Sequence, residues 1–173
     1  MTVVAGSTVE RRATRWGLFV AIAVAVVIVD QLTKAWLVAN VQPGGAIEIL
    51  GDWLRLIHGR NDGGLFGLFG GSAAVLAIAS LGVIGLIIAY HARSKPNVVL
   101  SIALGLLLGG AIGNLLDRIR FGYVIDFVDA GIGTLRFYTF NVADSAISIA
   151  ILLLILLALF PALGGAGSEP SNG

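Results

Sequence analysis

Four long runs of apolar residues constrain the fold of this chain more than any other feature. They cover residues 16–38, 71–90, 97–116 and about 142–163, and the second and third runs contain no charged residue. A helix needs about 20 apolar residues to cross the hydrocarbon core of a bilayer, and backbone groups without hydrogen bonds cannot face lipid. We therefore expect an all-α membrane protein with four transmembrane helices.

The composition agrees with this expectation. Only 12% of the 173 residues are charged, whereas soluble domains usually carry about a quarter. The chain contains no cysteine, which excludes a disulfide framework, a thiol nucleophile and a thiolate metal site. Its net charge of +1 gives no indication of a nucleic-acid partner, and we expect none.

The first apolar run has an alternative interpretation as a cleaved signal peptide, because Arg11, Arg12 and Arg15 precede it. A signal peptide ends at a cleavage site of the small-x-small type. No such site follows the run, and apolar residues resume after Lys34. We therefore interpret the run as a transmembrane helix.

Basic residues near the spans favour cytoplasmic N- and C-termini. This topology places five of the 11 Lys and Arg residues inside and six outside, so the count alone does not decide. The five lie in short flanks, where the positive-inside rule has most force. We expect a cytoplasmic segment over residues 1–15, one membrane domain over residues 16–163, and a disordered Gly/Ser-rich tail over residues 164–173.

Two connections, residues 39–70 and 117–141, are long and face the outside in this topology. Residues 46–58 alternate apolar and polar side chains around a central Gly-Asp pair, which predicts two short paired strands. Residues 135–140 alternate in the same way. We therefore expect a small extracytoplasmic β-cradle above the four helices.

Polar residues gather at the ends of the spans and in the outer connections. On an alternating topology they all come near one face of the membrane. Ionisable groups at this depth are costly and usually pair with each other or line a cavity. This cluster is therefore a candidate site, and its members are Asp30, Gln31, Lys34, Asn61, Asn114, Asp117, Arg118, Asp126, Asn141 and Asp144.

Most of these residues also have a purely structural interpretation. Asp30 and Lys34 have the spacing of a helical ion pair, and Arg118 can extend to the lipid headgroups. Asn141 and Asp144 have the spacing of a helix cap and an acid in the first turn. Both interpretations stay open at this point.

Other catalytic chemistries find little support. His58 and His91 are separated by a span and have no companion at the spacing of metal ligands, so we expect no metal site. No Ser-x-x-Lys motif or Ser/His pairing appears. Carboxylates are therefore the only plausible catalytic pair.

Five motifs occur in order at the span boundaries. They are Asp30-Gln31-Leu32-Thr33-Lys34, Asn61-Asp62-Gly63-Gly64-Leu65-Phe66, Gly109-Gly110-Ala111-Ile112-Gly113-Asn114-Leu115-Leu116-Asp117-Arg118, Val124-Ile125-Asp126-Phe127 and Phe140-Asn141-Val142-Ala143-Asp144-Ser145. Over roughly residues 16–160 the chain resembles the lipoprotein (type II) signal peptidases. One departure affects the local shape of the substrate groove: Leu65 stands where small residues are common, and Asp62 adds a charge.

The resemblance implies an aspartic endopeptidase of the bacterial inner membrane, with its active site at the extracytoplasmic face. Such enzymes remove the signal peptide from a prolipoprotein, cutting on the N-terminal side of a cysteine that carries diacylglycerol. The resemblance implies Asp126 and Asp144 as the catalytic dyad, with no metal or organic cofactor. The residues implied to bind substrate or support the site are Asp30, Lys34, Asn61, Gly110, Asn114, Arg118 and Asn141.

The resemblance also implies a mobile, helix-bearing lid loop on the periplasmic side, near residues 128–134. The prolipoprotein substrate and membrane lipid are the expected partners. We expect the protein to be a monomer.

Two aspartates suit amide hydrolysis because a close pair of carboxylates holds one proton between them. The ionised acid takes a proton from water, and the protonated acid hydrogen-bonds the substrate carbonyl. Asp144 lies in the first turn of a helix, where the dipole favours negative charge. Asp126 lies between Ile125 and Phe127, where desolvation raises its pKa. We therefore expect the proton on Asp126, with Asp144 as the base.

A different class of protein also has to be considered. Small four-span transporters use an acid in the first helix for proton coupling, and Asp30 is a candidate for that role. A coupling acid belongs near the midplane and is usually alone, whereas Asp30 has Lys34 beside it. A noncatalytic scaffold would leave the polar cluster unexplained.

Overall fold

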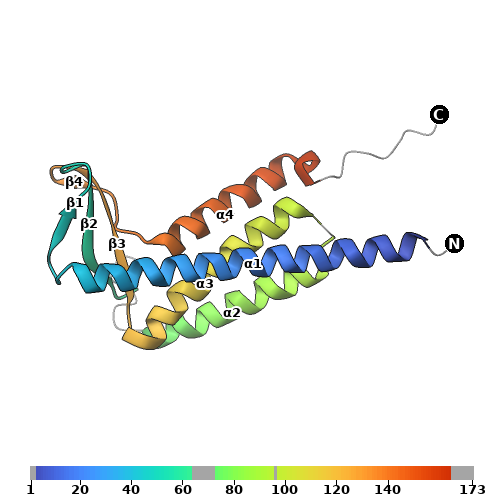
Figure 1. Cartoon of the computed structure of the whole chain (residues 1–173), viewed down its shortest axis with the longest axis horizontal. Helices are drawn as coiled ribbons and strands as arrows, with labels where there is room; N and C mark the ends of the chain where they lie inside the picture. The colour runs from blue at the N-terminus through green and yellow to red at the C-terminus, as the bar shows by residue number, and fades with distance from the viewer. Residues whose placement is uncertain (1–2, 64–72, 96, 165–173) are drawn as a thin grey trace.

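The computed structural model describes residues 3–63, 73–95 and 97–164, and four long helices dominate these residues (Figure 1). They are α1 (Val3–Asn40), α2 (Ala73–Arg93), α3 (Val98–Phe121) and α4 (Val142–Leu159), which is followed by the short 3-10 helix η1 (Pro161–Gly164). All four long helices have the length and apolar composition needed to cross a membrane. The four predicted spans are confirmed.

Several helix boundaries differ from the predicted spans: α2 continues to Arg93 and α3 to Phe121, beyond the predicted ends at residues 90 and 116. Helix α1 begins at Val3, so most of the segment expected to precede the membrane domain is helical, although its apolar stretch starts only at Arg15. Helix α4 ends at Leu159 because Pro161 has no backbone N–H and disfavours helical geometry in the residue before it. Residues 165–173 of the expected tail lie outside the described residues.

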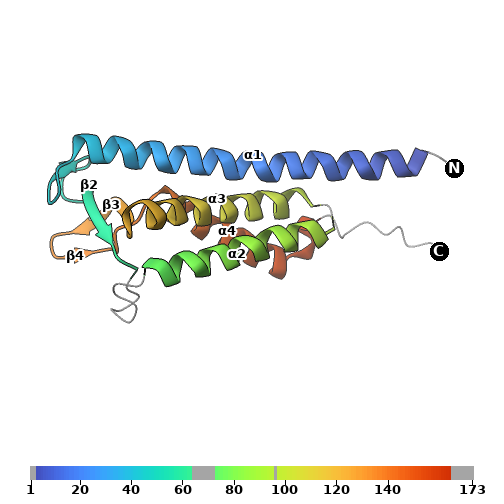
Figure 2. The ribbon, with the colours of Figure 1, turned by 90° about the horizontal axis from the view of Figure 1, so that it is seen from below.

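Helix α3 is the central element of the bundle, and α1, α2 and α4 all pack against it (Figures 1 and 2). More than half of its apolar stretch is buried, whereas less than a fifth of the apolar stretch is buried in each of the other three helices. Large apolar side chains cover the outer faces, including Leu32, Ile78, Leu86 and Ile155. An apolar outer surface of this kind is suited to contact with lipid chains.

Glycines on α3 allow its neighbours to approach closely. A Cβ atom at Gly109 would lie 2.6 Å from Cβ of Val26 on α1. A Cβ atom at Gly110 would lie 2.5 Å from the carbonyl oxygen of Ala143 on α4. Small residues at such crossings are typical of packed membrane helices. Gly110, expected to support the site, therefore sets the distance between α3 and the first turns of α4.

We expect Gly110→Ala to lower both stability and activity, since the new methyl group must displace the start of α4. Overpacking of this kind destabilises proteins by about 1–3 kcal/mol. The matched control is Gly85→Ala on α2, where an added Cβ has no neighbour within 4 Å. Thermal unfolding and peptide cleavage measured on both variants check the prediction. An unchanged melting temperature and cleavage rate for Gly110→Ala would contradict it.

A four-stranded antiparallel sheet stands at one end of the bundle (Figure 1). Its strands, in spatial order, are β1 (Ala46–Glu48), β2 (Leu54–Asn61), β3 (Val124–Ile132) and β4 (Leu135–Arg136). The predicted pair of strands within residues 46–58 is confirmed, with Ile47 opposite Leu56. The sheet packs on the helices through a core of Leu37, Val41, Ile125 and Phe127.

Two expectations about the outer connections need correction. Residues 128–134 were expected to carry a helix, but β3 continues through Ile132 and turns at Gly133 into β4. This segment is extended because its backbone pairs with β2 on one side and β4 on the other. Within residues 135–140 only the first two belong to β4, and Phe140 returns to pair with Val128 as an isolated bridge.

Ion pairs join three strands of the sheet. Asp129 on β3 is buried and accepts hydrogen bonds from Arg55 at 2.6 Å and from Arg136 at 2.8 Å. The hydrogen bond from Arg136, followed by that from Arg55, holds the pKa of Asp129 below its ordinary value. These contacts join β2, β3 and β4, and therefore stabilise the frame that carries Asp126.

Candidate active site

The structure brings the side chains of the predicted site together where the sheet meets the helices. They come from the second half of α1, the last turns of α3, the end of β2, the beginning of β3 and the first turn of α4. Figure 1 shows that these five segments lie at the same end of the molecule. The polar cluster inferred from the sequence is therefore a cluster in space.

Asn141 contacts both of the predicted catalytic acids. It caps α4 by accepting a hydrogen bond from the backbone N–H of Asp144 at 2.9 Å, while the Asp144 carboxylate accepts from the backbone N–H of Asn141 at 3.2 Å. Its side-chain amide also donates to Oδ1 of Asp126 at 2.7 Å. The structural interpretation of Asn141 as a helix cap is thus correct, and the same residue links the two carboxylates.

Asp126 is buried at the start of β3 and has two amide donors. Asn61 donates to its Oδ2 at 2.8 Å and Asn141 to its Oδ1 at 2.7 Å. Burial raises the pKa of Asp126 to about 6, the two amide hydrogen bonds oppose this rise, and the charge of Asp144 adds to it. A carboxyl group with such a pKa takes up a proton near neutral pH, as general acids must.

Asn114 on α3 holds Asp144 from the other side. Its amide nitrogen donates to Oδ1 of Asp144 at 2.8 Å. Its amide oxygen accepts from Nζ of Lys34 and from the side chain of Asn141, each at 3.2 Å. Because both ends of the amide are used, the side chain of Asn114 has a defined orientation. Asp144 is therefore fixed by two hydrogen-bonded neighbours: Asn141, through the helix cap, and Asn114.

Lys34 is the centre of a buried charge cluster beneath these amides. Its ammonium group lies 2.8 Å from a carboxylate oxygen of Asp30 and 2.8 Å from one of Asp117. All three side chains are almost completely buried. Asp30 also accepts a hydrogen bond from the backbone N–H of Ala143 at 2.9 Å. The cluster therefore ties α1 and α3 to the first turn of α4.

We expect Lys34→Met to lower the free energy of unfolding by about 3–5 kcal/mol, because it leaves two buried carboxylates without their cation. The matched control is the neutral set Asp30→Asn, Lys34→Met and Asp117→Asn, which removes the uncompensated charge and should recover part of the loss. Thermal unfolding in detergent compares the two. Equal stability of Lys34→Met and the unmodified protein would contradict the expected role of the cluster.

Arg118 and Asn61 border the two acids without joining the buried cluster. Arg118 donates to the carbonyl oxygen of Asn114 at 3.4 Å and lies within electrostatic range of Asp144, Asp117 and Asp126. Asn61 is exposed at the end of β2. Its neighbour Asp62, the charge noted in the sequence, pairs with Arg60 at 2.6 Å; Leu65 lies outside the described residues.

A cavity of about 550 Å³ opens beside Asp144 and leads along the first two turns of α4. Its walls combine apolar and hydroxyl side chains. The lining residues are Asn61, Phe137, Tyr138, Thr139, Phe140, Asp144, Ser145, Ser148 and Ile149. Within the described residues, no group of three or more His, Cys, Asp and Glu side chains is placed to hold a metal ion.

Comparison with known proteins identifies the family. A family model described as Signal peptidase (SPase) II matches residues 22–160. The chain belongs to the signal peptidase II family. It is 42% identical over 149 residues to a lipoprotein signal peptidase of Geobacillus kaustophilus, an alignment that covers 86% of this chain and 97% of the relative. It is 41% identical over 165 residues to a lipoprotein signal peptidase of Dehalococcoides mccartyi, and this alignment covers 90% of this chain and 98% of the relative.

A solved structure gives the same result for the fold. The structure described as a bacterial membrane enzyme at 2.3 Å resolution has a TM-score of 0.77 and 31% sequence identity, and the match covers 88% of this chain and 93% of that one. This chain is therefore a multi-pass membrane enzyme, a signal peptidase II, as its motifs predict. Asp30, paired with Lys34 and Ala143, is not the isolated acid that the transporter alternative requires.

In this signal peptidase II, Gln31 and Asp117 belong to the predicted polar cluster, but neither was predicted to bind substrate or support the site. Asp117 pairs with Lys34 and also accepts a hydrogen bond from the backbone N–H of Ile125 at 3.1 Å, one residue before Asp126. Gln31 donates to Asp117 at 3.0 Å and accepts from Arg120 at 2.8 Å. Helical spacing contained a signal for Asp117, because it follows Asn114 by three positions and both therefore lie on one face of the helix.

Proposed function

We propose that this signal peptidase II removes signal peptides from prolipoproteins by aspartic catalysis, with Asp126 and Asp144 as the two acids. The observation that carries the proposal is the double contact of Asn141, which caps Asp144 and donates to Asp126. The substrate class follows from the relatives named lipoprotein signal peptidase. In the proposal the cut lies on the N-terminal side of the diacylglyceryl-modified cysteine.

The two acids have different surroundings, and these suggest different roles. Asp144 lies at the N-terminus of α4, where the helix dipole favours a carboxylate, and it accepts hydrogen bonds from Asn141 and Asn114. Asp126 is buried, and its pKa is raised to about 6. The first proton taken up by the pair therefore goes to Asp126, which supports Asp144 as the base.

Hydrolysis follows from this assignment. Asp144 takes a proton from a water molecule as the water oxygen bonds to the scissile carbonyl carbon, while Asp126 gives its proton to the carbonyl oxygen. The tetrahedral intermediate then collapses: Asp144 returns its proton to the leaving nitrogen, the carbon–nitrogen bond breaks, and Asp126 recovers its proton from the hydroxyl group. Both acids end the cycle as they began it, so the dyad is a true catalyst.

The remaining site residues position the dyad in this proposal. Asn61 and Asn141 aim the carboxyl group of Asp126, and Asn114 aims that of Asp144. Gly110, Asp30 and Lys34 fix the start of α4, and Arg118 supplies a positive charge near both acids. Misplacement by an ångström lowers rates strongly when reacting groups must be aligned, so these residues affect turnover by positioning the two acids.

The cavity beside Asp144 is the proposed binding site for the peptide around the cut. Phe137, Phe140 and Ile149 give it an apolar lining, and Ser145 and Ser148 add hydroxyl groups. The site lies at the ends of the spans, so acyl chains on the substrate cysteine can remain in hydrocarbon while the peptide reaches the acids. With both termini cytoplasmic, this end of the bundle faces the outside of a bacterial inner membrane.

The proposed activity is tested by incubating the purified enzyme with a diacylglyceryl-modified precursor. The masses of both products are then measured by mass spectrometry. We expect a mature fragment that begins with the lipidated cysteine. A cut at any other bond would overturn the proposed cleavage site. Loss of cutting in Asp126→Asn, but not in the exposed carboxylate variant Glu48→Gln, ties the activity to the proposed site.

The raised pKa of Asp126 gives a pH dependence. Because Asp126 must be protonated to assist the carbonyl oxygen, kcat/KM should fall as pH rises above about 6, approaching tenfold per pH unit. The measurement is kcat/KM between pH 5 and pH 9 with a substrate that has no ionisable group near the cut. A kcat/KM that rises over this range would instead require a catalytic group that loses its proton.

A further inference from the structure

A second cavity lies at the end of the bundle opposite the aspartates. It encloses about 580 Å³ where the link between α2 and α3 meets the end of α4, and we call it the distal groove. One part of its lining is apolar and consists of Leu100, Leu154, Leu157, Ala158 and Pro161. The other part is polar and consists of Tyr90, Arg93, Ser94, Lys95 and Asn97. The groove is therefore amphipathic.

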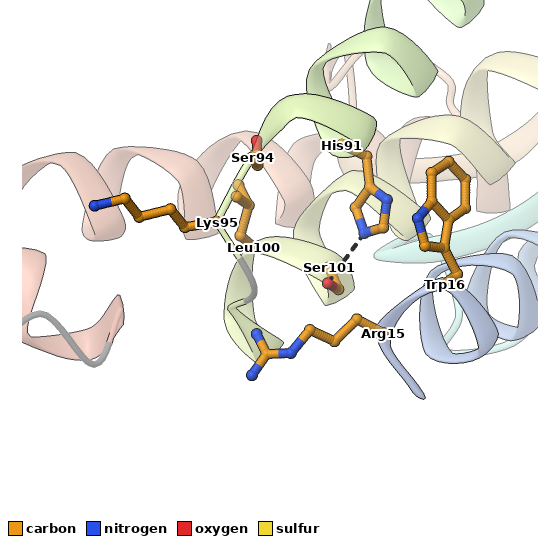
Figure 3. A pocket seen from close by; sticks show the side chains of 7 residues that line it. All are labelled: Arg15, Trp16, His91, Ser94, Lys95, Leu100 and Ser101. Carbon is orange, nitrogen blue, oxygen red and sulfur yellow. Dashed lines mark hydrogen bonds between the residues drawn. The ribbon is translucent and has the colours of Figure 1, made fainter. Parts of the chain in front are cut away.

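A small polar recess adjoins the distal groove and shares Ser94, Lys95 and Leu100 with it. Figure 3 shows Arg15 and Lys95 extending away from the ring of Trp16. His91, which is only 8% exposed, stacks on Phe19 with the ring centroids 4.1 Å apart and contacts Ser101 at 3.1 Å. His91 thus joins α1, α2 and α3 and forms a rigid wall of the recess.

Two buried polar atoms beside the recess lack a hydrogen-bond partner among the described residues. They are Nδ1 of His91 and Nη1 of Arg15. A buried donor without a partner is unfavourable by about 1–3 kcal/mol. An acceptor group bound at the recess would relieve this penalty for Arg15.

Among the side chains that the structure describes, the charge at this end is positive. In the described part of the chain, no carboxylate forms an ion pair with Arg15, Arg93 or Lys95, and no Asp or Glu lines either cavity. The sequence contains no acidic residue between positions 63 and 116. At the other end, by contrast, the sheet arginines 55, 60 and 136 are all paired with aspartates.

We propose that the distal groove binds one anionic phospholipid of the surrounding leaflet. Its phosphate lies among Arg15, Arg93 and Lys95, and one acyl chain follows Leu154 and Leu157 along α4. Basic pockets between transmembrane helices recognise anionic headgroups in this way. A free phosphate would leave the apolar wall uncovered, and a zwitterionic lipid would bring its own cation to a site that already has three.

The test uses Trp16 as a reporter, since it lines the recess. The other two tryptophans, Trp36 and Trp53, are more than half exposed at the sheet end and are replaced by Phe. The single-tryptophan protein is reconstituted in vesicles of phosphatidylcholine with brominated acyl chains, which quench tryptophan. Unbrominated phosphatidylglycerol is then titrated in, and the loss of quenching gives its affinity relative to phosphatidylcholine.

We expect phosphatidylglycerol to displace the quencher at a mole fraction well below that expected for random mixing. Each basic residue near an anionic headgroup strengthens binding about fivefold, so Arg93→Gln with Lys95→Gln should lower the preference about 30-fold. Ala158→Phe, which fills the groove, keeps every charge and adds no second tryptophan, should also lower it. The matched control, Arg60→Gln with Arg120→Gln, removes two exposed cations at the other end and should leave it unchanged.

Three results would overturn the proposal. The first is random mixing of the two lipids around Trp16 in the unmodified protein. The second is an equal loss of preference in the groove pair and the control pair, which would indicate only attraction to the overall charge. The third is an unchanged preference for phosphatidylglycerol in Ala158→Phe, which would leave the apolar wall without a role. Circular dichroism of each variant confirms that the helices are intact before its lipid preference is compared.

Discussion

Asp126→Asn and Asp144→Asn are each expected to lower kcat/KM by at least about a thousandfold, while the protein remains folded. Each substitution keeps the size of the side chain but removes a group that exchanges a proton in the proposed mechanism. Residues that act as a unit are strongly non-additive. The double variant should therefore lose hardly more activity than either single variant. Cleavage of a lipidated precursor under single-turnover conditions measures all three.

The control for this prediction is Glu48→Gln, which neutralises an exposed carboxylate on β1 of the same sheet. It should cleave at the unmodified rate. Thermal unfolding of Asp126→Asn and Asp144→Asn shows whether lost activity reflects chemistry rather than folding. The preparations must be free of contaminating wild-type enzyme. If either single variant then cleaves the precursor within tenfold of the unmodified rate, its acid has no place in the mechanism.

The second large effect concerns the lipid on the substrate. We expect a diacylglyceryl-modified precursor to be cleaved at least about a hundredfold faster than the same precursor without it, measured as kcat/KM in one detergent. Burial of each methylene group contributes about 0.8 kcal/mol, so three or four groups held in contact with the enzyme are sufficient for this ratio.

The control substrate carries a short alkyl group on the same cysteine sulfur, which preserves the thioether and removes the acyl chains. It should be cleaved as slowly as the unmodified precursor. If all three substrates are cleaved at equal rates, the enzyme recognises the peptide alone. The proposed place of the dyad at the bilayer boundary would then have no function in substrate selection.

The four spans could be predicted from the sequence because the thickness of a bilayer leaves few ways to arrange an apolar run. Their ends were less accurate, since caps and prolines decide them: Pro161 ends α4 earlier than its apolar residues suggest. The N-terminal part of α1 was not predicted as helix, because residues before Arg15 carry charges and no apolar periodicity.

The sheet was harder to predict because its strands pair across long sequence distances. Asn61 bonds to Asp126, which is 65 residues away, and no local pattern records that partner. The segment 128–134 was assigned to a helix-bearing loop, whereas pairing with β2 and β4 makes it extended. The hairpin of β1 and β2 was predicted correctly because its partners are neighbours in the chain.

The site shows the same difference between residues that local motifs predict and contacts that form between distant segments. Motif order brought out Asp126, Asp144 and the three asparagines, which the structure places within hydrogen-bonding distance of one another. Asp117 was included in the polar cluster, but its role was not predicted, because its contacts are with Lys34 on another helix and with a backbone N–H of β3. Those contacts exist only once the helices have packed.

Infrared spectroscopy of the carboxyl groups tests most directly whether the two acids share one proton. The free enzyme is titrated between pH 4 and pH 8, alongside Asp126→Asn and Asp144→Asn. The mechanism predicts one protonated carboxyl signal that titrates near pH 6, is absent from Asp126→Asn, and titrates at lower pH in Asp144→Asn because a repelling charge is gone. A signal that disappears in Asp144→Asn and persists in Asp126→Asn would reverse the two roles, and titration unaffected by either substitution would contradict a shared proton.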